Sequence, residues 1–340
     1  MTAAADGPAC RDVLTITREI DPADHRLGEL LRSLNLVDAD TLPALLDEAG
    51  RQHRSLRQAL LAGGYLTLYQ MALIETGNLD GLVLGSLRII DRLRVTPYGA
   101  VYRVFDPRRN QEAILRHLAE TEMEDAVHPD EFRQRFAQVT TVQHPQVAAT
   151  LEVLEINGRP GVLQKPLLGL PSNDWPGLAA VPGVWYRLLK QAALGLNAAH
   201  QAGLIHGHLE PSSFVLNGEG ILKLCALGEP RWLLVPPRTA SAEDSVTGDL
   251  ADLGRIAAGW AAVTVQRKGT KRKPLPEVLH TVLDRLTVAV DARRYFSAST
   301  LLEDLEKIAA GVPPNVEAWD RLLQDIRPQS TEGAALRQSA

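Results

Sequence analysis

Two histidines and a pair of hydroxyl side chains stand close together in the middle of the chain, in the stretch LIHGHLEPSSF from Leu204 to Phe214. His206 and His208 are two residues apart, and an imidazole can accept a proton near neutral pH, so proton transfer is the chemistry that they could perform. The same pair could bind a metal ion, but two histidines on a loop without a supporting set of cysteines and carboxylates make a poor metal site.

The segments on both sides of this stretch carry periodic patterns that predict the elements positioning it. Apolar residues at helical spacing predict a helix over residues 185–201 that leads directly into the stretch. Period-two alternation predicts strands within residues 87–118. The helical pattern also occurs in five other segments, which are residues 27–78 (with caps at Asp40 or Thr41 and at Thr67), 129–143, 275–286, 299–310 and 316–326.

Composition limits the class of protein and its partners. The 340 residues are 45% hydrophobic, typical of a globular protein, and the formal net charge of −5 gives no global attraction to nucleic acid or to an anionic membrane. The two cysteines, Cys10 and Cys225, form no C-x-x-C pair, which indicates a reducing compartment. No apolar leader and no run of eighteen apolar residues is present. We therefore expect a cytoplasmic protein without a membrane partner.

The order of the motifs resembles that of a bacterial serine/threonine protein kinase domain. The family's H-R-D-L-x-x-x-N and D-F-G are matched by HGHLEPSS and ALG, with Ala226 at the second Asp. V-A-I-K is matched by AILR, which ends at Arg116, and H-P-N-I by HPQV at 144–147. The opening D-x-x-x-L-G of the large helix in the family's C-lobe is matched by DLADLG from Asp249.

The resemblance covers about residues 86–310 and implies an α+β fold with two lobes, a small β-rich N-lobe and a larger helical C-lobe. Residues 23–84 are similar to the small helical domain that precedes the kinase domain in some bacterial kinases. The expected organisation is a flexible N-terminus (1–22), the helical domain (23–84), the kinase-like domain (85–311), and a C-terminal helix with a loose tail (312–340).

The resemblance also implies that the reactive side chains are missing. The positions of the strand lysine, the helix glutamate, the catalytic base and the two magnesium ligands hold Arg116, Arg135, His208, Ser213 and Ala226. We expect no catalytic or metal-binding residue among them. Arg116 and Arg135 are expected to face and repel each other; if the helix alignment slips by one turn, Glu131 becomes the nearest carboxylate.

The nucleotide pocket is expected to be vestigial, with ATP and magnesium lost. Only Gly99 of the Gly-rich loop is kept, because Arg94 and Thr96 replace the first two glycines, which let backbone N–H groups approach phosphates. Ile114 adds volume where the family has an alanine against the adenine. The positions of this expected pocket are Arg94, Gly99, Val101, Ile114, Gln164 and Val215.

Three further features follow from the same alignment. Asp249 is expected to bind the backbone of the loop around His206, and His206 to pack in the core as its family counterpart does. Val235-Pro236-Pro237 occupies the A-P-E position, so few residues separate it from Gly228 and none between Glu229 and Pro237 is Ser, Thr or Tyr. Arg294 is expected to be held by backbone carbonyls or Asp291.

The hypothesis is a catalytically inactive protein kinase, or pseudokinase, that acts as a binding or scaffold module for another protein, such as an active kinase. One alternative is an atypical kinase that still binds ATP. The other is binding of nucleic acid or an acidic partner through the basic loop QRKGTKRK at 266–273. No aromatic residue is interleaved there to stack bases, so we do not expect a nucleic-acid partner.

Overall fold

The computed structural model describes most of the chain, in the ranges 21–34, 36–38, 40–118, 128–233, 245–262, 275–287 and 293–326. Contacts divide the chain into two compact units, residues 1–82 and 83–340. The predicted flexible N-terminus lies outside the described residues up to position 20, and the tail lies outside them from position 327.

The first unit is a small helical domain built on leucine side chains. Leu31, Leu56 and Leu60 are fully buried in its core, together with leucines of the second helix and Met71. Ser55 and Thr67 begin two of the helices with capping boxes, in which the side-chain oxygen accepts from the third helical N–H. The elements are α1 (Pro22–Ser33), α2 (Thr41–Gln52), α3 (Leu56–Ala62), α4 (Leu68–Glu75) and the 3-10 turn η1 (Leu79–Leu82).

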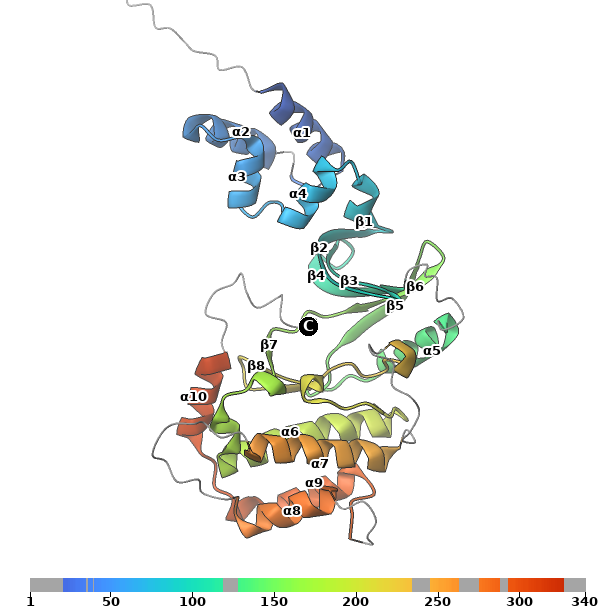
Figure 1. Cartoon of the computed structure of the whole chain (residues 1–340), viewed down its shortest axis with the longest axis vertical. Coiled ribbons are helices and arrows are strands. Elements are labelled where there is room, and N and C mark those ends of the chain that lie inside the picture. Colours follow the sequence, from blue (N-terminus) through green and yellow to red (C-terminus); the bar gives the residue numbers. More distant parts are fainter. Residues whose placement is uncertain are drawn as a thin grey trace, which may run out of the picture. The chain divides into compact units, whose positions relative to one another are not determined.

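The second unit begins with a six-stranded antiparallel sheet, which we call the N-lobe together with the helix α5 (Figure 1). The period-two pattern puts Ala113 and Leu115 on the buried face of the sheet and Ile114 and Arg116 on the other. The strand order is β1-β2-β3-β4-β6-β5. The bounds are β1 (Val83–Leu84), β2 (Leu87–Thr96), β3 (Gly99–Asp106), β4 (Gln111–Leu118), β5 (Thr150–Ile156) and β6 (Arg159–Gln164).

Helix α5 (Pro129–Val139) packs on this sheet through the apolar stripe predicted from the sequence. Phe132 and Phe136 are fully buried, with ring centroids 4.8 Å apart. Pro129 at the first helical position and two acidic residues in the first turn favour the start of the helix there.

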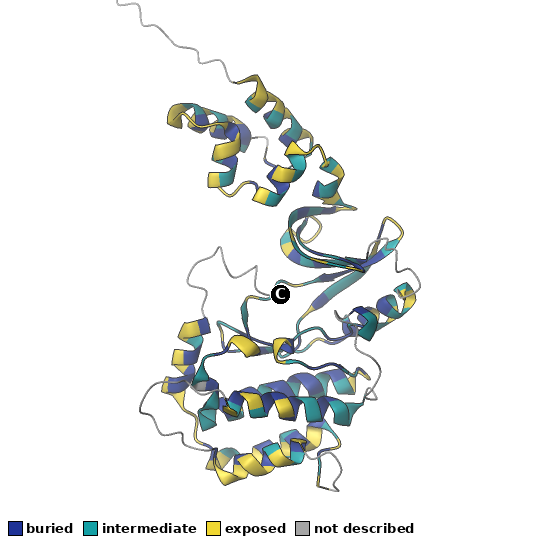
Figure 2. Ribbon diagram, in the orientation of Figure 1, coloured by how far each residue is buried: buried dark blue, intermediate teal, exposed yellow. Residues whose placement is uncertain are grey.

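The C-lobe is helical and contains the largest core of the protein. Helix α6 (Pro182–Gln201) is buried along most of its length (Figure 2), and Trp185 Nε1 donates to the carbonyl of Ala257 in α7 at 2.8 Å. The other elements are η3 (Ser172–Asp174), η4 (Gly177–Ala180), η5 (Pro211–Ser213), η6 (Arg231–Leu233), α7 (Val246–Ala262), α8 (Glu277–Thr287), α9 (Ala298–Ile308), η7 (Ala309–Gly311) and α10 (Val316–Ile326).

A small three-stranded sheet carries the loop that opened the sequence argument. Its strands β7 (Gly169–Pro171), β8 (Phe214–Asn217) and β9 (Leu222–Leu224) pair antiparallel in that order. Phe214 and Leu216 are fully buried, so the strand that follows the loop is fixed in the core. The predicted two-lobed α+β arrangement is confirmed.

No helix among the described residues is both long enough and apolar enough to cross a membrane.

Replacing Thr67 with alanine should loosen α4, because it removes the hydroxyl that accepts from the Gln70 N–H. The expected loss is about 1 kcal/mol, or roughly fivefold faster amide hydrogen exchange within residues 68–75, measured by mass spectrometry. Thr67→Ser keeps the acceptor and should exchange like the wild type. Equal exchange in both variants would show that the cap does not stabilise this helix.

Candidate functional site

A single buried carboxylate holds the loop that contains the two histidines. Asp249, in the first turn of α7, accepts from His206 N–H (2.9 Å), Gly207 N–H (2.8 Å) and His200 Nε2 (2.9 Å). Burial alone would raise the pKa of Asp249, but the bonds from His200 and from the two backbone N–H groups outweigh it and hold the pKa below its ordinary value. The predicted role of Asp249 is confirmed.

His206 is a core residue, as predicted. Its side chain is fully enclosed, and its Nε2 donates to the Cys225 carbonyl at 2.9 Å. Its Nδ1 has no hydrogen-bond partner among the residues that the structure describes. Burial, followed by the neighbouring His208 ring at 4.5 Å between centroids, lowers the pKa of His206 to about 4. His206 therefore stays neutral near pH 7, and its side chain contacts the protein core and not the solvent.

His208 and Ser213 stand at the positions aligned with the catalytic base and with one magnesium ligand, and both side chains are buried within the loop. His208 is 5% exposed and packs against the ring of His206. Ser213 is 3% exposed; its hydroxyl accepts from the Glu210 N–H at 3.1 Å, and its carbonyl accepts from the Cys225 N–H at 2.8 Å. These contacts close the turn η5 and join it to the segment after β9.

Ala226, at the position of the other magnesium ligand, has a left-handed backbone with φ of 59°. This conformation is unfavourable for a residue with a Cβ. Gly228 also has positive φ, and a Cβ added to it would lie 2.5 Å from Val139 Cγ2 in α5. The turn from Ala226 to Gly228 is therefore fixed by its close approach to α5.

Arg116 makes its ion pair with a residue that the sequence argument did not consider. Its Nη2 lies 2.6 Å from Glu229 Oε1, and the two side chains are only 18% and 13% exposed. Arg135 pairs with Glu131 one turn away in α5, at 2.9 Å. The expected repulsion between Arg116 and Arg135 is thus wrong, because each guanidinium has its own carboxylate.

The structure brings most of the expected pocket positions onto neighbouring strands. Val101 pairs with Arg94 on one side and with Arg116 on the other, and Ile114 pairs with Gln164. Gln164 Nε2 donates to Thr150 Oγ1 at 3.3 Å, so this amide is engaged within the sheet. Val215 lies in the small sheet and is buried.

The loop that aligns with the Gly-rich loop ends in a tight turn that buries the Tyr98 side chain. Thr96 pairs with Gly99, and Thr96 Oγ1 accepts from the Tyr98 N–H at 3.3 Å, so the turn uses one of its own backbone donors. The Tyr98 side chain is 3% exposed and meets the Trp232 ring edge-on at 5.5 Å.

No role was predicted from the sequence for Tyr98, Glu229 or Trp232. Glu229 and Trp232 could have been noticed as a carboxylate and a tryptophan close after the ALG motif, whereas Tyr98 carried no such signal.

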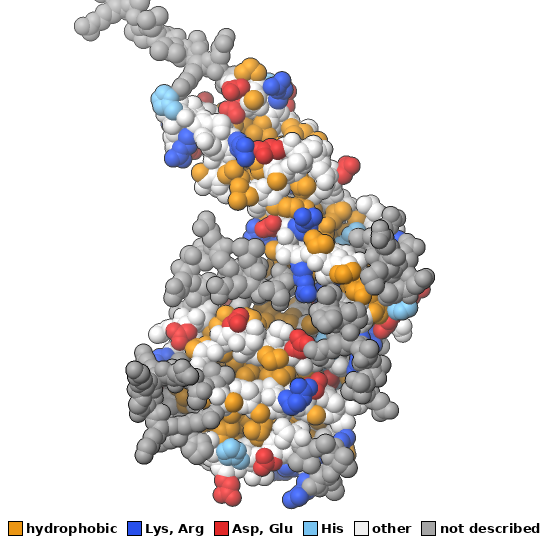
Figure 3. Space-filling view, in the orientation of Figure 1, with side chains coloured by type: hydrophobic (Ala, Val, Ile, Leu, Met, Phe, Trp, Pro, Cys, Tyr) orange, Lys and Arg blue, Asp and Glu red, His pale blue; other side chains and the backbone are white. Residues whose placement is uncertain are grey.

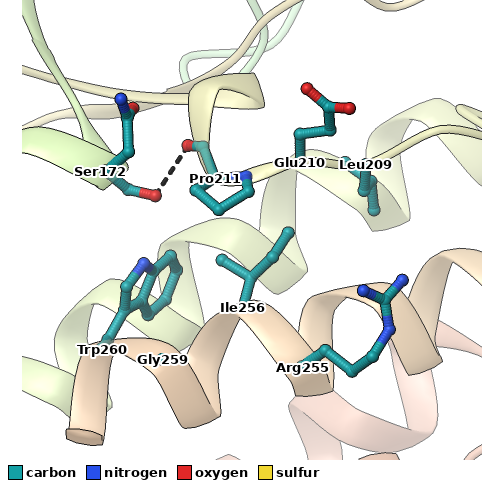
Figure 4. Close-up of a pocket in the computed structure, with 9 residues that line it drawn as sticks. Ser172, Leu209, Glu210, Pro211, Arg255, Ile256, Gly259 and Trp260 are labelled. Atoms are coloured by element: carbon teal, nitrogen blue, oxygen red, sulfur yellow. Dashed lines mark hydrogen bonds between the residues drawn. The ribbon is translucent and has the colours of Figure 1, made fainter. Parts of the chain in front are cut away.

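A pocket of about 390 Å³ lies beside the loop, between it and α7 (Figure 4). Ser172 Oγ donates to the Pro211 carbonyl at 2.6 Å on one wall, and Ile256 and Trp260 form the other. Trp260 Nε1 is buried without a hydrogen-bond partner in the described part of the chain. The remaining lining residues are Asn173, Leu209, Glu210, Arg255 and Gly259.

The donor set does not fit a magnesium nucleotide. Magnesium requires oxygen ligands, usually carboxylates, whereas the two aligned positions hold Ser213, whose hydroxyl is engaged in its turn, and Ala226, which has no side-chain donor. Within the described ranges, no group of three His, Cys, Asp or Glu residues could hold a metal ion.

On the face of the molecule shown in Figure 3, charge is mixed in sign: acidic and basic side chains are interspersed there.

Several predicted features cannot be placed. The segment with Val235-Pro236-Pro237, the basic loop 266–273 and Asp291 lie outside the described residues. Arg294 lies over the Phe296 ring, 5.4 Å from its centroid.

Comparison with known proteins relates the chain to bacterial kinases. No family model matches it. It is 28% identical over 183 residues to the serine/threonine-protein kinase Pkn1 of Myxococcus xanthus, covering 49% of this chain. It is 20% identical over 283 residues to the probable serine/threonine-protein kinase pknA2 of Bifidobacterium longum, covering 70% of this chain. These matches span only 25% and 37% of the two relatives.

Solved structures establish the fold. Two mutant forms of the Mycobacterium tuberculosis PknI kinase domain superpose with TM-scores of 0.50 and 0.51, at 22% and 21% identity. Each match covers 67% of this chain and 98% of the other. The chain therefore has the two-lobed protein-kinase fold, and it is related to bacterial serine/threonine kinases.

The buried His206 should make stability depend on pH. Below pH 6.5 the His206 imidazole is protonated in the unfolded chain, whereas in the folded chain it stays neutral down to about pH 4. The free energy of unfolding should therefore fall as the pH is lowered through this window, by up to about 3 kcal/mol. His206→Asn, which does not titrate, should show a shallower pH dependence in urea unfolding. An unchanged slope would mean that other groups account for the loss.

Ala226→Gly should stabilise the protein, because glycine adopts the left-handed conformation without steric cost. The expected gain is about 1 kcal/mol in the free energy of unfolding, measured with denaturant. The matched control is Ala137→Gly on the exposed side of α5, where the same change should cost about 1 kcal/mol. A loss of stability at position 226 as well would contradict the described turn.

Proposed function

We propose that this chain is a pseudokinase, a binding module with the protein-kinase fold that engages another protein and does not transfer phosphate. The observation that carries the proposal is the engagement of Arg116 by Glu229, at the strand position where the family has its phosphate-binding lysine. The family's lysine pairs with a carboxylate of the helix that corresponds to α5, whereas Arg116 pairs with a carboxylate that follows the ALG motif.

The other aligned positions support the same proposal. Phosphoryl transfer depends on positioning and on neutralising the charge of the transferred group with metal ions and cations. His208 and Ser213 are buried in contacts that hold the loop together, and Ala226 has no donor for a metal ion. A base alone, without these partners, lacks the charge stabilisation that the reaction requires.

The proposed partner is a protein, such as an active kinase, in the cytoplasm. The pocket beside the loop gives such a partner a largely apolar surface with the exposed Arg255 among its lining residues. The helical unit of residues 22–82 offers a second surface on the same chain.

An atypical serine/threonine kinase is the second candidate, and one observation favours it. Both curated relatives are named as serine/threonine kinases, and the second of these matches extends over 70% of this chain. An enzyme of this kind would have to bind ATP with residues other than the family's own, so nucleotide binding separates the two candidates.

The proposal predicts that millimolar ATP with magnesium leaves the melting temperature of the full chain unchanged and that no radiolabel passes from γ-labelled ATP to the chain or to an added protein substrate. Affinity purification from the native cell should recover a specific protein partner.

ATP-dependent stabilisation together with phosphate transfer that is lost in His208→Ala would overturn the proposal in favour of the atypical kinase. For a readout of the surface itself, Arg255→Ala changes an exposed residue that lines the pocket and should weaken partner recovery while the thermal unfolding curve stays close to that of the wild type.

A further inference from the structure

The segment Glu229–Leu233, which we call the strap, contacts four parts of the second unit. It directly follows the turn at Gly228 and contains the 3-10 turn η6. Its residues reach β4, the tip between β2 and β3, helix α5 and the loop before β8, as the next three paragraphs describe.

The first contact is electrostatic. Glu229 Oε1 accepts from Arg116 Nη2 at 2.6 Å, in a pair that is mostly shielded from water. A guanidinium binds carboxylate and phosphate with the same fork of N–H donors. Glu229 therefore occupies an anion site on β4.

The second contact closes the tip of the N-lobe hairpin. Trp232 meets the Tyr98 ring at 5.5 Å with the planes nearly perpendicular, a favourable edge-to-face geometry. Its Nε1 donates to Glu131 Oε2 at 3.0 Å, while the other oxygen of Glu131 accepts from Arg135. One tryptophan thus joins the hairpin tip to α5.

The remaining contacts join the strap to the N-lobe core and to the loop before β8. Leu233 is buried in the N-lobe core with Tyr98, Phe132 and Phe136. Arg231 Nη2 donates to the Gly207 carbonyl at 3.2 Å, in the loop that Asp249 holds.

We propose that the strap acts as an internal ligand: the Glu229 carboxylate fills the anion site at Arg116, and Trp232 joins the hairpin tip to α5, so the site is occupied without an external ligand. The site accepts a soluble polyphosphate only when the Glu229 carboxylate is removed. This inference concerns what occupies the anion site at Arg116 and goes beyond the absence of phosphate transfer.

Binding of inorganic tripolyphosphate by the full chain tests the anion site. At low ionic strength, Glu229→Gln should bind tripolyphosphate at least roughly tenfold more tightly than the wild type, because Arg116 is left without its carboxylate. Bound anion should raise the melting temperature of this variant by about 2–4 °C, with no shift for the wild type.

The matched control is Glu155→Gln, which removes one negative charge from an exposed pair with Arg133 elsewhere in the N-lobe. It should bind tripolyphosphate like the wild type. The double variant Arg116→Gln/Glu229→Gln carries no buried charge at the site; it should fold and should lose the binding that Glu229→Gln gains.

Hydrogen exchange tests the aromatic part of the strap without any ligand. Trp232→Leu should speed exchange of amides in residues 93–103 and 129–139 while leaving α6 unchanged, and this readout applies even if Glu229→Gln does not fold.

Equal tripolyphosphate binding by the wild type and Glu229→Gln, or equal binding by Glu229→Gln and the double variant, would overturn the anion site. Unchanged exchange in Trp232→Leu would overturn the proposed role of Trp232 in joining the hairpin tip to α5. Phosphate transfer by the wild type would overturn the proposed function instead.

Discussion

The carboxylate of Asp249 is the contact on which the geometry of the site depends. It is buried and accepts three hydrogen bonds, two from the backbone of the loop and one from His200 in α6. A buried charge is tolerated only when it is fully paired. The loop, α6 and α7 therefore have to stay in one arrangement, because moving any of them would leave this charge exposed to an apolar core. The positions of His206 and of the segment after β9 follow from that arrangement.

The structure separates what the fold requires from what phosphate transfer requires. The apolar residues around the loop, such as Leu209, Phe214 and Leu224, are buried and contribute to one continuous core. The side chains that would carry the reaction are replaced by residues that bond within the chain. Ser213 closes a turn, and Arg116 takes a carboxylate from its own chain. The fold therefore tolerates other residues at these aligned positions, and the fold alone does not specify the chemistry.

Much of the fold could be predicted because local patterns specify it. Residues 316–326 were predicted as a helix from apolar spacing after two prolines, and α10 has these bounds. The stripe of Phe132 and Phe136 was predicted in the same way, whereas the role of Asp249 was predicted from the resemblance to the kinase family. The ion-pair partner of Arg116 could not be predicted, because Glu229 lies 113 residues away along the chain and many other carboxylates could pair with a guanidinium. The left-handed backbone at Ala226 was also missed: local preference opposes it, and the close approach of Gly228 to Val139 imposes it.

The position of Glu229 in the chain has a consequence for competition. It is one residue beyond the rigid turn at Gly228, so its carboxylate cannot diffuse away from Arg116. A group tethered this closely acts at an effective concentration of about a millimolar or more. That value is independent of how much anion the surrounding solution contains. A soluble anion would therefore have to compete with this effective concentration before it could displace the Glu229 carboxylate from Arg116.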